Sequence, residues 1–171
     1  MRLARLTFVV VVLMLAASGA TWMLAQQQRA SDMLSPEDYL EILQMYYLYA
    51  HDVDPGSEHD ASWMFAEDGS FSSGGDPVVG RAALKEFYEG VRNRHSAGIR
   101  HVNASVVIMP TEEGARGMGY MLQVEQRQED GPIEITLFGK YTDRWVQTSE
   151  GWRIKERRFV ADTWRGDTSN Q

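Results

Sequence analysis

Residues 100–126 read RHVNASVVIMPTEEGARGMGYMLQVEQ, and this stretch decides the fold class. Two runs of strand-like residues, 100–110 and 116–127, flank the turn sequence EEG. Two further runs, 133–147 and 152–160, follow the turn sequences EDGP and SEG. Strands joined by such short turns pair with their neighbours along the chain. The second half of the chain therefore predicts an antiparallel meander.

The first half of the chain predicts helices. Ser35 is typical of a helix N-cap before Pro36, and apolar residues recur at helical spacing as far as Val53. This helix is apolar on nearly every side, which predicts nearly complete burial. Ser57 begins a short second helix, EHDASWMFA, and residues 80–94 form a third. Three helices followed by a curved antiparallel sheet make an α+β domain.

The N-terminus carries a targeting signal. Arg2 and Arg5 precede an uncharged stretch over residues 6–25, the pattern of a secretory signal peptide. Twenty uncharged residues are also long enough for an uncleaved membrane anchor. Both interpretations predict export, into a periplasm or an equivalent compartment. We expect a linker at 26–34, a folded domain at 35–165 and a disordered tail at 166–171.

Composition excludes several classes of function. The formal net charge is −7 and the basic residues are mostly scattered, which argues against nucleic-acid binding. The chain has no cysteine, so it has no disulfide, no thiolate nucleophile and no cysteine zinc site. Neither an H-x-x-x-H nor an H-E-x-x-H helix motif occurs, and we expect no metal and no cofactor. The five Trp, seven Tyr and nine Met residues suit a cavity for a hydrophobic small molecule.

Six short motifs give the chain a family resemblance. They are YAHDVD (49–54), WMFAEDGSF (63–71), GRAAL (80–84), RHVN (100–103), GKYTDRW (139–145) and GWRIKERR (151–158). In this order and spacing the chain resembles the SnoaL-like branch of the nuclear transport factor 2-like superfamily, which includes scytalone dehydratase, bile acid dehydratase and ketosteroid isomerase. The resemblance implies a cone: a curved antiparallel sheet wrapped by the three N-terminal helices around one cavity. It also implies a homodimer formed through the outer face of the sheet.

The resemblance implies a role for His101. An imidazole with a pKa near ~6.5 exchanges protons at neutral pH. The family's strand histidine falls on His101, which would point into the cavity together with Asn103. The alternating residues Val102, Val106 and Ile108 would then point outward. A hydrogen-bonded core histidine is the alternative.

Further site residues follow from the same resemblance. Tyr49 would donate a hydrogen bond to a substrate carbonyl, and Asp54 would orient His101, with Asp52 as its alternative. Arg157, or its neighbour Arg158, would bind an acidic substrate group or Asp54.

Two further tyrosines and one acid complete the set. Tyr120 and Tyr141 would line the cavity, although their strand parity is open. The dehydratases and isomerases of the family carry an additional acid on a cavity strand. The stretch RGMGYMLQV (116–124) has none, and Asp143 on a later strand could face either way.

These residues lead to alternative functions. The first is a cofactor-independent lyase, such as a dehydratase, or isomerase that acts on a hydrophobic cyclic carbonyl compound by acid–base catalysis. The second is a non-catalytic module of the same fold that binds a small molecule or dimerises. Epoxide hydrolysis ranks third because it needs two aspartates and an arginine around a water molecule.

Overall fold

The structure is a computed structural model that describes residues 34–94 and 98–162. The expected signal peptide or anchor and the C-terminal tail lie outside these residues, as does nearly all of the linker. Within the two described ranges, no helix is long and apolar enough to cross a membrane.

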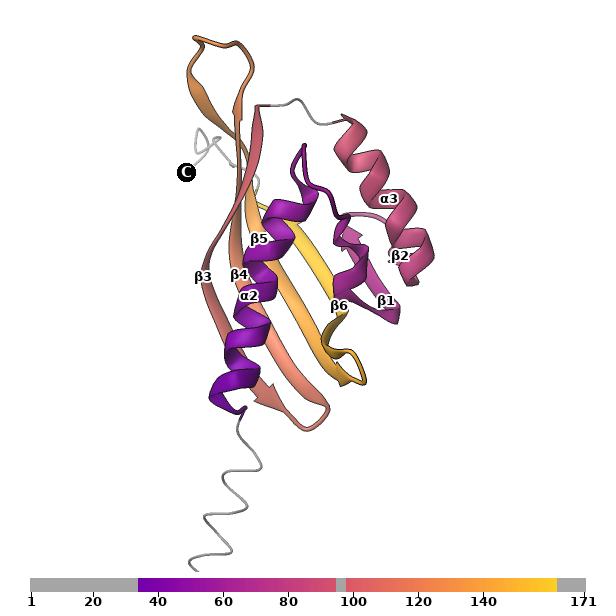
Figure 1. Cartoon of the computed structure of the whole chain (residues 1–171). Helices are drawn as coiled ribbons and strands as arrows, with labels where there is room; N and C mark the ends of the chain where they lie inside the picture. Colours follow the sequence, from indigo (N-terminus) through magenta and orange to yellow (C-terminus); the bar gives the residue numbers. More distant parts are fainter. Residues whose placement is uncertain (1–33, 95–97, 163–171) are drawn as a thin grey trace, which may run out of the picture. The chain divides into compact units, whose positions relative to one another are not determined.

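The described residues form an α+β domain with one sheet (Figure 1). Its elements are α2 (Pro36–Val53), the 3-10 helix η1 (Ala61–Met64), β1 (Phe65–Ser73), β2 (Val78–Val79), α3 (Arg81–Arg94), β3 (Ile99–Thr111), β4 (Gly114–Gln126), β5 (Ile133–Thr148) and β6 (Gly151–Ala161). The six strands lie in the order β2-β1-β6-β5-β4-β3. The predicted meander from β3 to β6 is confirmed. The prediction of three helices is not, because the second is a single 3-10 turn that Asp60 caps.

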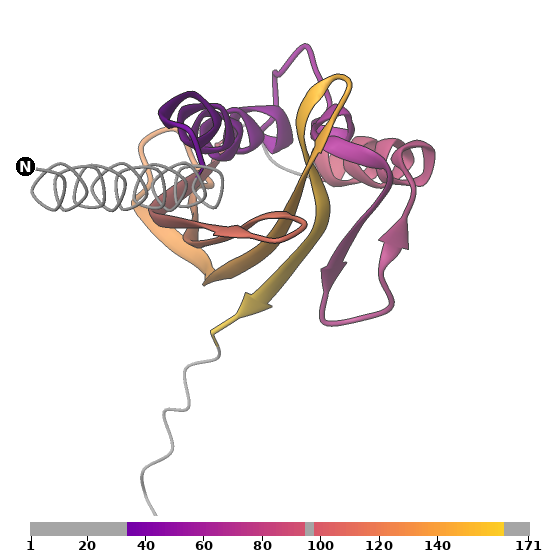
Figure 2. The ribbon, with the colours of Figure 1, turned by 90° about the horizontal axis from the view of Figure 1, so that it is seen from below.

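The sheet also contains a parallel pair of strands that the sequence did not predict. β1 lies parallel to β6 and carries the two-residue strand β2 on its other side. Both α-helices lie on one face of the curved sheet, which we call the inner face (Figure 2). α2 packs mainly against β3, whereas α3 packs against β1 and η1. The core therefore lies between these helices and the inner face.

Helix α2 begins and ends where its sequence predicts. The Ser35 hydroxyl accepts a hydrogen bond from the Asp38 amide, and the Asp38 carboxylate accepts from Ser35 in return, which forms a capping box. The helix stops at Val53, and Asp54 has an extended backbone. The prediction of nearly complete burial is wrong, since Leu40 is 62% and Tyr47 46% exposed. The helix buries one face only.

Strand β3 contains a bulge that changes which side chains point inward. Its pairing with β4 shifts between Ala104 and Val107, and Ser105 has a positive φ of 52°. An extra residue of this kind reverses the alternation beyond it. Val102 points outward as predicted, but Ile108 is buried. The prediction that Val106 and Ile108 point outward with Val102 is therefore wrong.

Candidate functional site

The end of α2 and the start of β3 bring together Asp54 and His101. The His101 Nδ1 atom lies 2.7 Å from Asp54 Oδ1, and the His101 backbone N–H donates to the same oxygen at 3.0 Å. The two side chains are only 9% and 10% exposed. β3 is an edge strand, so no neighbouring strand lies on this side to accept a hydrogen bond from the His101 N–H group. The Asp54 carboxylate accepts that hydrogen bond instead. The contact fixes both the ring and the backbone of His101.

The position of Asp54 depends on where α2 ends. Because the helix stops at Val53, the extended backbone of Asp54 directs its carboxylate to β3. Asp52, the alternative, has a different function. Its carboxylate accepts hydrogen bonds from the Ser57 hydroxyl at 2.9 Å and the Trp63 indole at 2.8 Å. Asp52 thus holds the loop after α2, while Asp54 pairs with the histidine.

A hollow of about 370 Å³ opens beside the Asp54–His101 pair. It lies between the last turn of α2, the following loop and the start of β3. Besides the pair itself, its lining residues are Ala50, His51, Pro55, Gly56, Ser57 and Arg100. An imidazole and a carboxylate thus border this hollow.

A second polar cluster lies inside the core. Arg157 and Asp143 form a two-point ion pair, with N–O distances of 2.9 and 2.7 Å, and both side chains are fully buried. The rings of Tyr49, Tyr141 and Tyr46 surround the guanidinium carbon, with their centroids at 4.1, 4.6 and 5.0 Å. Such cation–π contacts stabilise a buried arginine.

The charges of this cluster follow from its burial. Burial opposes the charge on Arg157, but the Asp143 carboxylate outweighs it and holds the pKa of the guanidinium well above its usual value. Burial raises the pKa of Tyr49, and the charge of Arg157 offsets only part of that rise. Burial and the Asp143 charge together raise the pKa of Tyr46. Arg157 therefore stays charged, and both phenols stay protonated.

The predicted site residues do not form one site. Asp54 and His101 meet at the hollow, whereas Tyr49, Tyr141 and Arg157 belong to the buried cluster. The Tyr49 hydroxyl pairs with that of Tyr88 at 2.9 Å, and Arg157 pairs with Asp143 and not with Asp54.

Two further predicted residues hold other positions. Asn103 faces inward and donates to the Tyr46 carbonyl oxygen at 2.6 Å. Tyr120 is 48% exposed and contacts Phe138 on the outer face of the sheet, with a ring distance of 6.3 Å. The prediction that Tyr120 lines the cavity is therefore wrong.

Asp143 points into the core, a direction that the sequence left open. Its neighbours at two-residue spacing, Tyr141 and Trp145, are both buried, and Asp143 is 0% exposed. This spacing was a usable signal, because a strand directs alternate residues to the same face. Asp143 is therefore a buried carboxylate of the inner face, and its partner is Arg157.

In the described ranges, no group of three or more histidine, aspartate or glutamate side chains could hold a metal ion.

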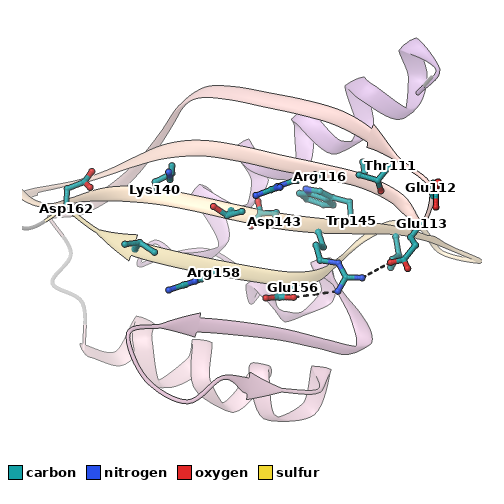
Figure 3. A pocket seen from close by; sticks show the side chains of 15 residues that line it. Thr111, Glu112, Glu113, Arg116, Lys140, Asp143, Trp145, Glu156, Arg158 and Asp162 are labelled. Carbon is teal, nitrogen blue, oxygen red and sulfur yellow. Dashed lines mark hydrogen bonds and ion pairs between the residues drawn. The ribbon is translucent and has the colours of Figure 1, made fainter. Parts of the chain in front are cut away.

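The outer face of the sheet carries a second, larger hollow (Figure 3). This groove of about 820 Å³ runs over β4, β5 and β6. Arg144 lies within it and pairs with Glu113 at 2.8 Å and Glu156 at 3.7 Å. The groove is bordered by charged side chains and lies on the face opposite the helices.

Comparison with known proteins identifies the family of this domain. A family model for the SnoaL-like domain matches residues 35–158. The chain belongs to the SnoaL-like domain family. A comparison with curated protein sequences found no match.

Solved structures share the fold of this SnoaL-like domain. A protein of unknown function from Mycobacterium tuberculosis has a TM-score of 0.68 at 25% identity, covering 80% of this chain and 84% of its own. An NTF2-like protein with a cystatin-like fold from Novosphingobium aromaticivorans has a TM-score of 0.66 at 20% identity, covering 85% and 91%. A third structure, provisionally assigned as an aromatic ring hydroxylase from Novosphingobium aromaticivorans, has a TM-score of 0.63 at 25% identity, covering 76% and 92%.

The buried cluster of this SnoaL-like domain requires glycine at position 117. A Cβ atom there would lie 2.3 Å from the Tyr46 hydroxyl and 2.8 Å from the Trp145 ring nitrogen. We expect Gly117→Ala to lower the free energy of unfolding by about 1–3 kcal/mol, because a packed core resists added atoms. Urea unfolding measures the loss. Gly119→Ala is the matched control, since its Cβ meets Val106 at 3.3 Å and should cost less; equal losses would contradict this explanation.

Proposed function

We propose that this SnoaL-like domain is a cofactor-independent lyase, such as a dehydratase, or isomerase of a small cyclic carbonyl compound. The observation that supports this most is the Asp54–His101 pair at a hollow. His101 would be the general base and acid, and Asp54 its positioning partner. When Nδ1 donates to the carboxylate, Nε2 is the basic nitrogen of the neutral ring.

The proposed step is a proton transfer next to a carbonyl group. His101 takes a proton from the carbon beside the carbonyl, and the electron pair of that C–H bond forms an enolate. In an isomerisation the imidazolium returns the proton to another carbon. In a dehydration the enolate expels a hydroxyl group from the next carbon, and this group takes up the proton and leaves as water. Neither route needs an oxidant or a reductant.

The size of the hollow supports a small substrate. Its volume of about 370 Å³ is near the lower end of the range for small-molecule sites. Tyr49 does not line this hollow, and its hydroxyl is engaged by Tyr88. We therefore propose that proton transfer depends on His101. Tyr49 would stabilise the core and would not contact the substrate.

Incubation with a panel of cyclic β-hydroxyketones and unsaturated ketones tests this proposal. A dehydratase converts the first class to conjugated enones with new ultraviolet absorbance, and an isomerase moves the double bond of the second. The His101→Gln variant serves as the blank. Products formed equally by both proteins would overturn the proposal. A compound retained tightly and unaltered would instead favour the alternative, a non-catalytic binding module of the same fold.

We also propose that the domain forms a homodimer through its outer face. Val102, Leu122 and Phe138 are cross-strand neighbours there, with Tyr120 beside Phe138. Val102, Tyr120 and Phe138 are 46%, 48% and 43% exposed, and contiguous apolar surface of this kind marks interaction sites.

Substitution within this apolar surface tests the dimer. We expect Phe138→Glu to convert the dimer to a monomer, because the partner surface would have to bury a charge. Light scattering after size-exclusion chromatography measures the mass. Val79→Glu changes an apolar residue on the edge strand β2 that is even more exposed, at 57%, and this variant should remain dimeric. A monomeric wild-type protein would refute the proposal.

The site of action is proposed to lie outside the cytoplasm. The support is the charge and hydropathy pattern of residues 1–25. Cell fractionation tests export. The mass of the mature protein then distinguishes a cleaved signal from an anchor.

A further inference from the structure

We infer that Arg92 is a positioning residue for the Asp54–His101 pair, acting through the loop that follows α2. This loop, residues 54–60, connects α2 to η1 and carries Asp54 at its first position. The inference rests on the proposed function for its catalytic consequence. Its structural part can be tested without a substrate.

Arg92 binds the backbone of the loop directly. It lies near the end of α3, and its Nη1 atom donates to the carbonyl oxygens of His59 at 2.8 Å and Ser57 at 3.3 Å. Hydrogen bonds from a charged donor are stronger than those between neutral groups. One side chain of α3 therefore holds two successive parts of the loop.

Among residues 34–94 and 98–162, the loop has few other attachments to the rest of the domain. The Ser57 hydroxyl donates to Asp52 at 2.9 Å, and at the start of the loop the Asp54 carboxylate accepts from His101. Gly56, between these two points, has a φ of +89°, and an added Cβ would meet no atom within 4 Å. The middle of the loop is therefore not packed, and Arg92 supplies a main restraint on its far side.

Hollows on both sides of the loop show why this restraint matters. Pro55, Gly56 and Ser57 line the 370 Å³ hollow beside His101. The same three residues line another hollow of about 440 Å³, which is distinct from the groove on the outer face. Arg92 and Glu89 line the other side of this hollow. The loop is thus a thin wall with space on each side. Without Arg92 it could move away from β3 and draw Asp54 from His101.

Hydrogen exchange of the His101 backbone amide tests this inference. That amide donates to Asp54, so its exchange rate reports whether the carboxylate stays in place. Arg92→Met keeps the aliphatic stem but removes the donors, and we expect about tenfold faster exchange, in line with the loss of charge-assisted hydrogen bonds. Arg92→Lys should restore part of the protection, because one ammonium group can donate to both carbonyl oxygens. Arg94→Met, an exposed change on the same helix, should have no effect.

Unchanged exchange at His101 in Arg92→Met would overturn the inference. So would faster exchange that Arg94→Met reproduces, because a general effect on α3 would explain it. For a substrate found by the panel, Arg92→Met should lower kcat about tenfold with little change in KM, since the misplaced pair affects the reaction more than binding. If His101→Gln leaves turnover intact, the proposed function fails, while the exchange result still decides whether Arg92 positions Asp54.

Discussion

Replacing Arg157 by methionine is expected to lower the free energy of unfolding by about 3–5 kcal/mol. The substitution would leave the Asp143 carboxylate buried at 0% exposure without its cation. A buried charge that loses its partner costs far more than the loss of a surface ion pair. The cation–π contacts to Tyr49, Tyr141 and Tyr46 would disappear as well. A domain of this size has little stability to spare, so partial unfolding at room temperature is an expected outcome.

Denaturant unfolding followed by circular dichroism measures this loss. Arg158→Met is the matched control, because Arg158 is the next residue and lies on the exposed outer face. Its effect should stay within about 0.5 kcal/mol. The double substitution Arg157→Met with Asp143→Leu should recover much of the stability, since it removes both buried charges. Equal midpoints for Arg157→Met and Arg158→Met would show that the buried pair contributes little.

Replacing His101 by glutamine is expected to lower kcat by about 10²–10⁴-fold, the usual contribution of general acid–base catalysis. Glutamine fills similar space but cannot exchange a proton near neutral pH. Asp54→Asn should lower kcat in the same direction by a smaller factor, because the ring remains while its carboxylate partner is lost. Steady-state kinetics on a substrate identified from the ketone panel measures both effects.

The control for this experiment is His59→Gln. His59 is exposed and does not line the hollow at His101, so its replacement should leave kcat nearly unchanged. Circular dichroism would confirm that the His101 and Asp54 variants remain folded. Wild-type turnover in the His101→Gln variant would remove the acid–base mechanism and leave a binding module.

Local sequence signals account for most of the fold that was predicted correctly. The capping box at Ser35, the end of α2 before Asp54 and the short turns between strands β3 to β6 are all formed by residues close in sequence. The parallel pairing of β1 with β6 joins residues 86 to 89 positions apart, and no local signal marks it. The predicted second helix is only one 3-10 turn in the structure, because strand β1 already begins at Phe65.

The candidate site was predictable in part. The resemblance placed His101 and Asp54 in one site, and the structure brings them within 2.7 Å. It also suggested Tyr49 and Arg157 for the same site. In the structure both are buried in the core, where Tyr49 pairs with Tyr88 and Arg157 with Asp143. Helical spacing explains the separation: Tyr49 and Asp54 are five residues apart, so they do not share a face of the helix.

What the sequence alone determined is the order of the elements, the ends of α2 and the alternation within each uninterrupted length of strand. Only the tertiary structure decided which of the alternating residues point inward beyond a bulge. In β6, the pairing with β5 shifts around Lys155, since Ile154 pairs with Trp145 and Glu156 with Arg144. Alternation counted from Ile154 would direct Arg158 inward, whereas the extra residue directs Arg157 to Asp143. A bulge depends on how two distant strands pair and curve, so a repeating pattern of two residues cannot reveal it.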